Sequence, residues 1–405
     1  MTNTNSFLRN NIQKKNLDTR LSKKLENKFD KVFLEIKEDL KKSDRTINVL
    51  DNKFVFNFKI RDLKKFKTFK TIAIIGMGGS ILGVEAIYSF LKKKIKKKVF
   101  FFNDLDENKI SCFKKNQKLS KVLFIIISKS GNTIETLSNT FSLSIIKKNS
   151  KNVIIISEKK NNILFSLSKK MNLFYIEHKD YIGGRFSVLS EVGIIPAYLM
   201  GINIFKLRSR ILDSLSLKNR IYLKDHTTKL ASLIKSQKFN DLIFLNYLPE
   251  LEKFLFWSQQ LVAESLGKQN KGFLPVISSA PKDHHSLLQL YLDGPHNKLF
   301  NIFSFEKKSL KKIKLNKNIN IKSFLNKKRL STIKQAQKNA LIKTFKKKKI
   351  PFREFRIKEI NEETLGKLFS YFIIETIIIG KLLNINPFNQ PAVEQVKEYT
   401  RELLS

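Results

Sequence analysis

Cysteine is almost absent from this sequence, and residue patterns typical of metal sites and secretion signals are also missing. Cys112 is the single cysteine in 405 residues, which excludes an internal disulfide framework and fits a reducing, cytoplasmic compartment. The five histidines show no spacing typical of metal ligands, so we expect no metal site. The N-terminal residues lack an apolar stretch that could act as a secretion signal.

Acidic residues are scarce relative to basic ones: 35 Asp and Glu face 78 Lys and Arg, a formal net charge of +43. Such a charge ordinarily indicates nucleic acid or an anionic membrane as partner. Here the lysines are spread from end to end among many Ile, Asn and Phe residues, which indicates a compositional bias. We therefore expect neither nucleic acid nor membrane as a partner, although a positive potential would attract a small phosphorylated metabolite.

The chain length allows two or three domains of about 100 to 200 residues each. After a polar, helix-forming stretch of about seventy residues, short apolar runs alternate with helical segments: "TIAIIG", "VFFFN", "KVLFIIIS", "NVIIIS" and "NLFYIEH". Continuous apolar runs of this length are typical of a parallel sheet buried on both faces. In the preceding stretch, Leu25, Phe29, Val32, Phe33 and Ile36 share one face of a predicted helix.

The same alternation begins again after Gly201 with "DLIFLNYL", a long helical segment, "FLPVISSA" and "KLFNIFSF". We therefore expect two doubly wound α/β domains: residues 1–201 with the N-terminal helical segment, and residues 202–384. Residues 385–405 form a C-terminal helical tail that we expect to complete the active site. The lysine-rich segment Lys307–Lys349 is expected to carry helices or loops of the second domain. Glu375 and Lys381 interrupt "YFIIETIIIGKLL", which favours a buried helix over a membrane span.

A glycine cluster follows the first predicted strand, in "IAIIGMGGSILG" from Ile72 to Gly83. A strand, a glycine turn and a helix N-terminus form an anion site, because unpaired N–H groups point to one place. Two alternatives stay open on this stretch alone. Gly76, Gly78 and Asp104 partly match a dinucleotide fingerprint, with Ile81 at the third glycine position, and the glycines could simply let a helix pack closely on its strand.

A second candidate anion site follows "KVLFIII" in the segment "SKSGNTIET". Ser128, Ser130 and Thr133 can donate hydrogen bonds to phosphate oxygens, and Lys129 can balance their charge. The alternative is an ordinary capped helix with Glu135 in its first turn. Two such turns on neighbouring strands of one sheet together favour a phosphate site.

Six segments, in order, resemble the signature segments of the glucose-6-phosphate isomerase family, in its short bacterial form. The segments are "GMGGSILG", "SKSGNTIET", "GGRFSVLSEVGIIPA", "QLVAESLGK", "DHHSLLQLYLDG" and "INPFNQPAVEQVK". The resemblance extends from about Ile72 to the C-terminus. It implies two sugar-isomerase (SIS-type) α/β domains and metal-independent, cofactor-independent interconversion of glucose 6-phosphate and fructose 6-phosphate.

The resemblance also implies roles for individual residues. Glu264 corresponds to the carboxylate that moves the proton, His285 to the ring-opening histidine, Lys397 to the lysine that assists it, and Arg185 to the arginine that stabilises the enediolate. The implied substrate-binding and phosphate-binding residues are Gly79, Ser80, Ser128, Lys129, Ser130, Thr133, Gln260 and Gln390. The family further implies a homodimer in which His285 completes the neighbouring subunit's site.

The residues themselves leave several of these roles open. Glu264 could pair with Lys268 on the surface of its helix, His284 and His285 cannot be told apart, and Lys397 has the pattern of a solvated lysine. The "SGNT" variant also allows a bifunctional phosphoglucose/phosphomannose isomerase. Two other classes remain as alternatives: a sugar-phosphate-sensing DNA-binding regulator, for which no clear helix-turn-helix precedes Ile72, and a nicotinamide-dependent dehydrogenase.

Overall fold

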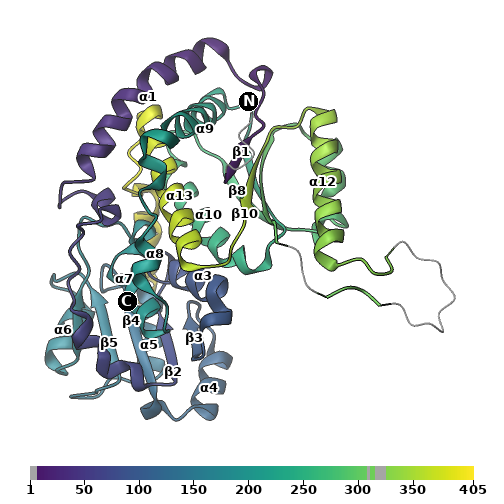
Figure 1. Cartoon of the computed structure of the whole chain (residues 1–405). Helices are drawn as coiled ribbons and strands as arrows, with labels where there is room; N and C mark the ends of the chain where they lie inside the picture. The colour runs from purple at the N-terminus through teal and green to yellow at the C-terminus, as the bar shows by residue number, and fades with distance from the viewer. Residues whose placement is uncertain (1–6, 308–310, 315–324) are drawn as a thin grey trace.

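The computed structural model of the chain describes residues 7–307, 311–314 and 325–405. They form two α/β units, each built on a five-stranded sheet, with a layer of long helices between the two sheets (Figure 1). Of the lysine-rich segment Lys307–Lys349, residues 308–310 and 315–324 lie outside the described residues, and the rest includes the helix α12 (Leu330–Lys348), in line with the expected helices or loops. The α/β architecture with two sheets, predicted from the alternating apolar runs, is confirmed.

The first sheet is parallel throughout and has the strand order β3-β2-β4-β5-β6. Its strands are β2 (Thr71–Ile75), β3 (Lys98–Phe102), β4 (Val122–Ile127), β5 (Val153–Ser157) and β6 (Phe174–Glu177). All six residues of the central strand β4 are buried, as a strand covered by helices on both faces requires. The parallel sheet predicted for this part of the chain is confirmed.

The second sheet has the order β1-β10-β9-β7-β8 and is parallel except for β1. Its strands are β1 (Leu8–Asn10), β7 (Asp241–Asn246), β8 (Leu274–Ser279), β9 (Lys298–Phe305) and β10 (Phe352–Ile357). If each unit's parallel strands are numbered along the chain, both sheets contain the same 2-1-3-4 order. The units are therefore two versions of one doubly wound fold.

The second sheet draws on parts of the chain that the expected division at residue 201 separates. β1 precedes the first unit in sequence but pairs with β10, with Leu8 opposite Phe355. Neither strand is apparent from sequence patterning, because β1 has three residues and β10 reads "FREFRI" with two arginines. Strand β10 is nevertheless buried, since Arg353 is paired inside the protein.

Long helices join the two units into one body. α1 (Thr19–Asp39) buries the five-residue face predicted from its sequence, and α13 (Glu362–Leu383) is buried along most of its length. α10 (Glu252–Leu266) ends at Gly267 as expected and packs against α3 (Leu82–Leu91) of the first unit. Other helices are α2 (Ile60–Leu63), α4 (Glu107–Asn116), α5 (Ile134–Ser142), α6 (Ile163–Lys170), α7 (Glu191–Leu199), α8 (Ile204–Arg208), α9 (Leu217–Ser236), α11 (Leu288–Asp293), α12 (Leu330–Lys348) and α14 (Glu394–Leu404).

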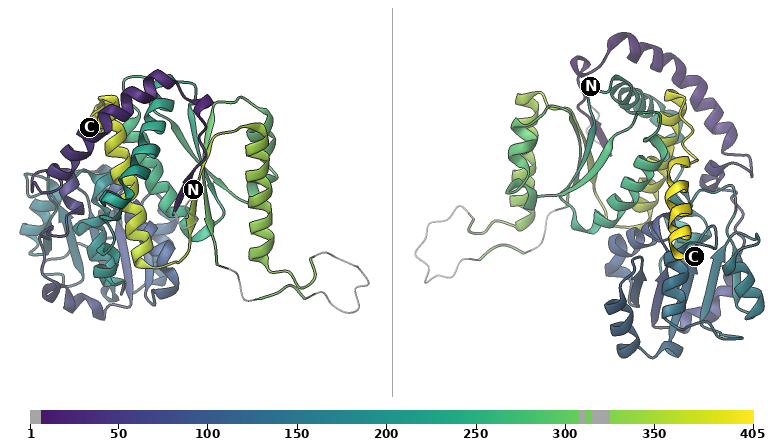
Figure 2. Two further views of the ribbon diagram at one scale, coloured as in Figure 1. Left: turned by 45° about the horizontal axis from the view of Figure 1, so that its top comes forward. Right: turned by 180° about the vertical axis from the view of Figure 1, so that it is seen from behind.

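The largest apolar core runs continuously from the inner face of the first sheet to that of the second, and smaller clusters lie beneath their outer faces. The C-terminal helix α14 returns to the first unit (Figure 2), where Arg401 lines a surface pocket with residues of α5 and α6. Among the described residues, no helix has the length and apolar character needed to cross a membrane.

Candidate active site

Arg185 is the centre of a buried hydrogen-bond cluster between the two units. It belongs to the 3-10 helix η7 (Gly184–Leu189), and only 2% of its surface is exposed. Its Nε donates to Ser265 Oγ at 2.8 Å, and its Nη2 donates to the backbone carbonyls of Pro387 and Asn389 at 2.6 and 3.1 Å. Burial lowers the pKa of Arg185, while the nearby carboxylate of Glu264 opposes that shift.

Glu264 and Gln260 extend from one face of α10 towards this arginine, as their spacing of four residues predicts. Arg185 Nη1 donates to Glu264 Oε2 at 3.0 Å, and Gln260 Nε2 donates to Glu264 Oε1 at 2.9 Å. About a third of the Glu264 side chain remains exposed, at 32%. The carboxylate is therefore held in a fixed orientation yet is open to a ligand. The alternative pairing with Lys268 is not formed.

The glycine cluster lies directly beside these side chains. It forms the 3-10 helix η4 (Gly78–Ser80) between β2 and α3. Gly78 has a φ of +51°, and a Cβ there would be 2.9 Å from Gln260 Nε2. Gly79 lies against the backbone of Gly184. These glycines therefore bring a strand-to-helix turn, and the buried side chain of Ser80, next to Arg185 and Gln260.

The second predicted anion turn follows β4, which neighbours β2 in the sheet. Ser128 Oγ and Thr133 Oγ1 lie 2.8 Å apart, and Ser128 Oγ also accepts from the Gly131 N–H at 3.2 Å. Ser130 is exposed, and its Oγ accepts from the Asn132 N–H at 3.3 Å. Hydroxyl and N–H groups thus gather at the carboxyl end of β4, where parallel sheets bind ligands.

The ammonium of Lys129 points away from these hydroxyls. Its Nζ donates to the carbonyl of Asp180 at 2.7 Å and lies 3.5 Å from Glu158 Oε1. It contributes positive charge near the turn, whereas the hydroxyls of the neighbouring residues supply the directed donors.

The C-terminal segment that precedes α14 closes one side of the cluster. Gln390 Oε1 accepts from Arg185 Nη1 at 2.7 Å. Two contributors were not identified from the sequence: Ser265, which accepts from Arg185, and Lys268. Lys268 Nζ donates to the carbonyl of Asn386 at 2.5 Å and to Asn389 Oδ1 at 3.2 Å. Burial, followed by the nearby charge of Arg185, lowers the pKa of Lys268 to about 8.

His285 and Lys397 lie apart from this cluster within the single chain. His285 is exposed in the loop after β8, and neither of these residues hydrogen-bonds to Glu264 or Arg185 in the part of the chain that the structure describes. Lys397, 51% exposed on α14, donates to Glu394 Oε1 at 2.8 Å. The neighbouring His284 is engaged differently, with its Nε2 lying 2.7 Å from the Tyr247 hydroxyl.

No cluster of three or more His, Cys, Asp or Glu side chains suited to a metal ion occurs among the described residues. The cluster around Arg185 offers one accessible carboxylate, one buried guanidinium and two turns rich in hydrogen-bond donors. This combination can hold an anionic substrate, exchange a proton with it and stabilise negative charge that develops beside the arginine.

Solved structures share this two-unit fold. A hypothetical protein from Thermus thermophilus matches with a TM-score of 0.82 and 22% identity, covering 96% of this chain and 99% of its own. A glucose-6-phosphate isomerase from Chlamydia trachomatis matches with a TM-score of 0.68 and 19% identity, over 85% of this chain and 71% of that one. The protein thus belongs to the class of proteins with this two-unit α/β fold, with a carboxylate and an arginine at the junction of its two units.

The family follows from sequence comparison. The phosphoglucose isomerase family model matches residues 47–273, and the chain belongs to that family. It is 32% identical to a glucose-6-phosphate isomerase from Methanocaldococcus jannaschii, over 86% of this chain and 88% of the relative. It is 31% identical to a glucose-6-phosphate isomerase from Mycoplasmopsis synoviae, over 81% of each chain. The resemblance noted from the six sequence segments is confirmed at the level of the family.

Proposed function

We propose that the protein catalyses the reversible isomerisation of glucose 6-phosphate and fructose 6-phosphate. The reaction opens the sugar ring, moves a proton between C1 and C2 through a cis-enediol intermediate, and needs no metal ion. Membership of the phosphoglucose isomerase family supports this reaction. The observation that carries it is the carboxylate of Glu264, oriented by Arg185 and Gln260 and open on one side beside the glycine turn.

Glu264 is the proposed base and acid of the proton transfer. As a carboxylate it can remove the proton from C2 of the open-chain aldose, and as the resulting acid it can return that proton to C1. The hydrogen bond from Gln260 leaves Oε1 fixed in direction. A fixed carboxylate that serves two adjacent carbons requires no large movement between the two half-steps.

Arg185 is the proposed cation that stabilises the enediolate. Its guanidinium is already oriented by the five hydrogen bonds that it donates, to Ser265, Glu264, Gln390 and two backbone carbonyls. Such a preorganised cation in a buried place stabilises developing negative charge without paying for reorientation during the reaction. Removing the C2 proton puts that charge on the substrate's oxygen atoms beside Glu264.

The phosphoryl group of the substrate is proposed to bind between the two donor-rich turns. The backbone at Gly79 and the hydroxyls of Ser80, Ser128, Ser130 and Thr133 supply donors, and Lys129 supplies charge. Support comes from their position at the carboxyl ends of the adjacent strands β2 and β4. Anchoring the phosphoryl group there leaves the other end of the extended sugar for the chemistry at Glu264.

His285 and Lys397 are proposed to open the ring, with His285 supplied by a second subunit of a homodimer. Exposure of His285 in the single chain supports this, since an exposed side chain is available to a neighbouring subunit. Lys397 would exchange its exposed contact with Glu394 for a contact in the site. The remaining substrate contact from the C-terminal segment is Gln390, which already touches Arg185.

A coupled assay of the purified protein tests this proposal directly. Fructose 6-phosphate is the substrate, and glucose 6-phosphate formation is followed through a glucose-6-phosphate dehydrogenase that reduces NADP⁺. We expect turnover that is unchanged by an excess of chelator, and a parallel assay with mannose 6-phosphate measures the substrate range. Absence of fructose 6-phosphate turnover in folded protein would refute the proposal.

A further inference from the structure

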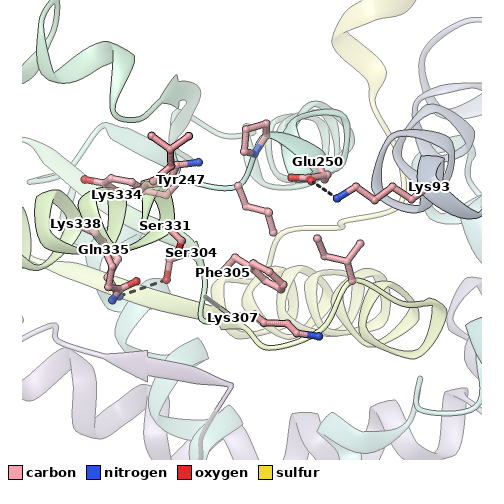
Figure 3. Close-up of a pocket in the computed structure, with 14 residues that line it drawn as sticks. Lys93, Tyr247, Glu250, Ser304, Phe305, Lys307, Ser331, Lys334, Gln335 and Lys338 are labelled. Carbon is pink, nitrogen blue, oxygen red and sulfur yellow. Dashed lines mark hydrogen bonds and ion pairs between the residues drawn. The ribbon is translucent and has the colours of Figure 1, made fainter. Parts of the chain in front are cut away.

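A cavity lies at the carboxyl ends of the strands of the second sheet, and it shares no lining residue with the candidate active site. Its volume is about 260 Å³, close to the lower end of the roughly 300–1,000 Å³ range of small-molecule sites. It opens between the ends of β7 and β9, where Tyr247 and Ser304 contribute to its wall (Figure 3). The space suits a compact ligand.

The position of this cavity in the fold is the first argument for a ligand. The order in which strands are added to the sheet reverses between β7 and β9, because β8 lies on one side of this pair and β10 lies on the other. In doubly wound sheets this switch point is the place where crossover connections diverge and leave a crevice for ligands. In the first unit, the pair β2 and β4 occupies the same position and carries the two donor-rich turns.

The second argument is the polar inner face of α12. A helix packed on a sheet ordinarily turns apolar residues inward, and the later part of α12 does so with Leu341 and Phe345. Its first half instead presents Lys334, Gln335 and Lys338 to the cavity. Polar side chains in place of core residues, around an open space, indicate a surface built for a polar ligand.

Lys338 provides a buried ammonium at this place. Only 3% of its surface is exposed, and lysine is almost never buried to this extent unless its charge is paired. Its Nζ donates to a Glu354 carboxylate oxygen. It also donates to Ser304 Oγ at 3.4 Å (Figure 3). An ammonium has three N–H donors, so within the described residues one donor remains for a ligand.

The balance of charge around the cavity favours an anion. Lys93 of the first unit reaches across to Glu250 at 3.6 Å and so neutralises the acid that lines the cavity (Figure 3). Lys307 and the half-buried Lys334 have no acidic partner in the ranges that the structure describes. With Lys338 paired to Glu354, these two lysines leave the cavity with a net positive charge.

We propose that this cavity binds a small organic phosphate at a site distinct from the active site. The phosphate would accept hydrogen bonds from Lys334 and Lys338 and would be attracted by Lys307. The apolar side chains of Phe305, Leu330 and Ile360 would contact the carbon skeleton of the ligand. This assignment uses no residue of the candidate active site and holds whichever reaction that site performs.

Inorganic phosphate is the probe for a binding experiment on the full-length protein. Equilibrium dialysis counts bound phosphate per chain, and we expect two, one at each site. The double variant Lys307→Gln/Lys334→Gln should retain the first and weaken the second about tenfold or more, because charge-assisted hydrogen bonds are lost. The matched control, Lys346→Gln/Lys347→Gln, removes the same charge from the exposed last turn of α12. This control should still bind two phosphates per chain.

Two further variants separate this site from the active site. Ser128→Ala/Thr133→Val should weaken the first phosphate only, and Lys338→Met should weaken the second only, provided that its circular dichroism matches the parent. The proposal is wrong if the parent protein binds a single phosphate that Ser128→Ala/Thr133→Val removes. It is equally wrong if both lysine double variants weaken the second phosphate to the same extent, because binding would then follow overall charge.

Discussion

The backbone of Gly79 lies against the backbone of Gly184, so closely that a Cβ atom on Gly79 would stand 2.2 Å from the Gly184 carbonyl carbon. Ser187 Oγ, which donates to the Gly184 carbonyl at 2.7 Å, also lies 3.5 Å from the Gly79 carbonyl oxygen and so contacts both segments. The glycine turn and the segment that carries Arg185 therefore have one fixed separation. In the proposed reaction, that separation sets the distance between the bound phosphoryl group and the arginine.

The first prediction concerns this contact. Gly79→Ala should destabilise the protein by about 1–3 kcal/mol or more, because the added carbon meets backbone atoms that cannot move aside cheaply. It should also lower kcat/KM by about tenfold or more through displacement of the turn. Thermal unfolding and the coupled assay measure the two effects.

Gly184→Ala is the matched control for that change, since a Cβ on Gly184 meets only one atom, at 3.8 Å. It should leave stability and activity close to the parent values. Equal effects of the two substitutions would contradict the assigned role of the close approach.

The second prediction concerns Glu264. Glu264→Gln keeps the shape and the hydrogen bond to Arg185 but removes the base, so kcat should fall by about 10²–10⁴-fold. Binding of a phosphorylated inhibitor should change little, because the phosphate turns are not touched. Glu252→Gln, an exposed glutamate in the first turn of the same helix, should behave like the parent. Loss of inhibitor affinity in proportion to kcat would count against the assignment as base.

The third prediction tests whether His285 acts across a dimer interface. Glu264→Gln and His285→Ala should each be nearly inactive as pure proteins. After subunit exchange of an equal mixture, half of the dimers are hybrids, and each hybrid has one intact site. Activity should therefore return to about a quarter of the parent value.

A same-chain role for His285 would give no recovery, because every site would then lack one group. The exposed His296→Ala variant controls for loss of a histidine and should be active alone.

Patterns of neighbouring residues were enough to predict the local elements of the fold. The continuous apolar runs of β2 and β4 and the buried face of α1 follow from short-range periodicity, and the structure confirms them. Strand β10 was not predicted, because Arg353 interrupts its apolar pattern. Its burial depends on Glu375, 22 residues away on α13, and no local pattern reports such a pairing.

In the candidate site, too, contacts between residues close in sequence were predictable, whereas contacts between distant residues were not. The i,i+4 spacing of Gln260 and Glu264 predicts a shared helix face, and the structure has it. The contact between Arg185 and Gln390 joins positions 205 residues apart, and only the family resemblance brought these two residues together. Lys268 and Ser265 were missed because a lysine and a serine near a helix end usually face solvent.

The fourth prediction follows from the buried pair of Arg353 and Glu375. Arg353 Nη1 donates to Glu375 Oε1 at 2.5 Å, and Tyr371 donates to the same oxygen at 2.6 Å. Glu375→Gln leaves a buried guanidinium without its counter-charge and should lower the free energy of unfolding by about 3–5 kcal/mol. Urea unfolding measures this loss. Glu363→Gln, in the first turn of the same helix, should cost far less, and a similar cost would contradict the pairing argument.

The fifth prediction concerns acid stability and His178. This side chain is 2% exposed, and burial lowers its pKa to about 4 from an ordinary value of 6.5. Between these two values the unfolded chain binds a proton that the folded protein excludes, so stability falls as pH falls from 6.5 towards 4. At pH 5 this one histidine should cost about 2 kcal/mol relative to pH 7.5.

Urea unfolding at several pH values measures this dependence in the parent and in two variants. His178→Asn can keep a hydrogen bond to the Lys179 carbonyl, which the histidine ring contacts through Nδ1 at 2.8 Å, but it cannot take up a proton. Its stability should therefore fall less steeply between pH 6.5 and 4 than that of the parent. His296→Asn removes an exposed histidine and should retain the parent slope. If His178→Asn also retains the parent slope, the folded protein does not exclude the proton from His178.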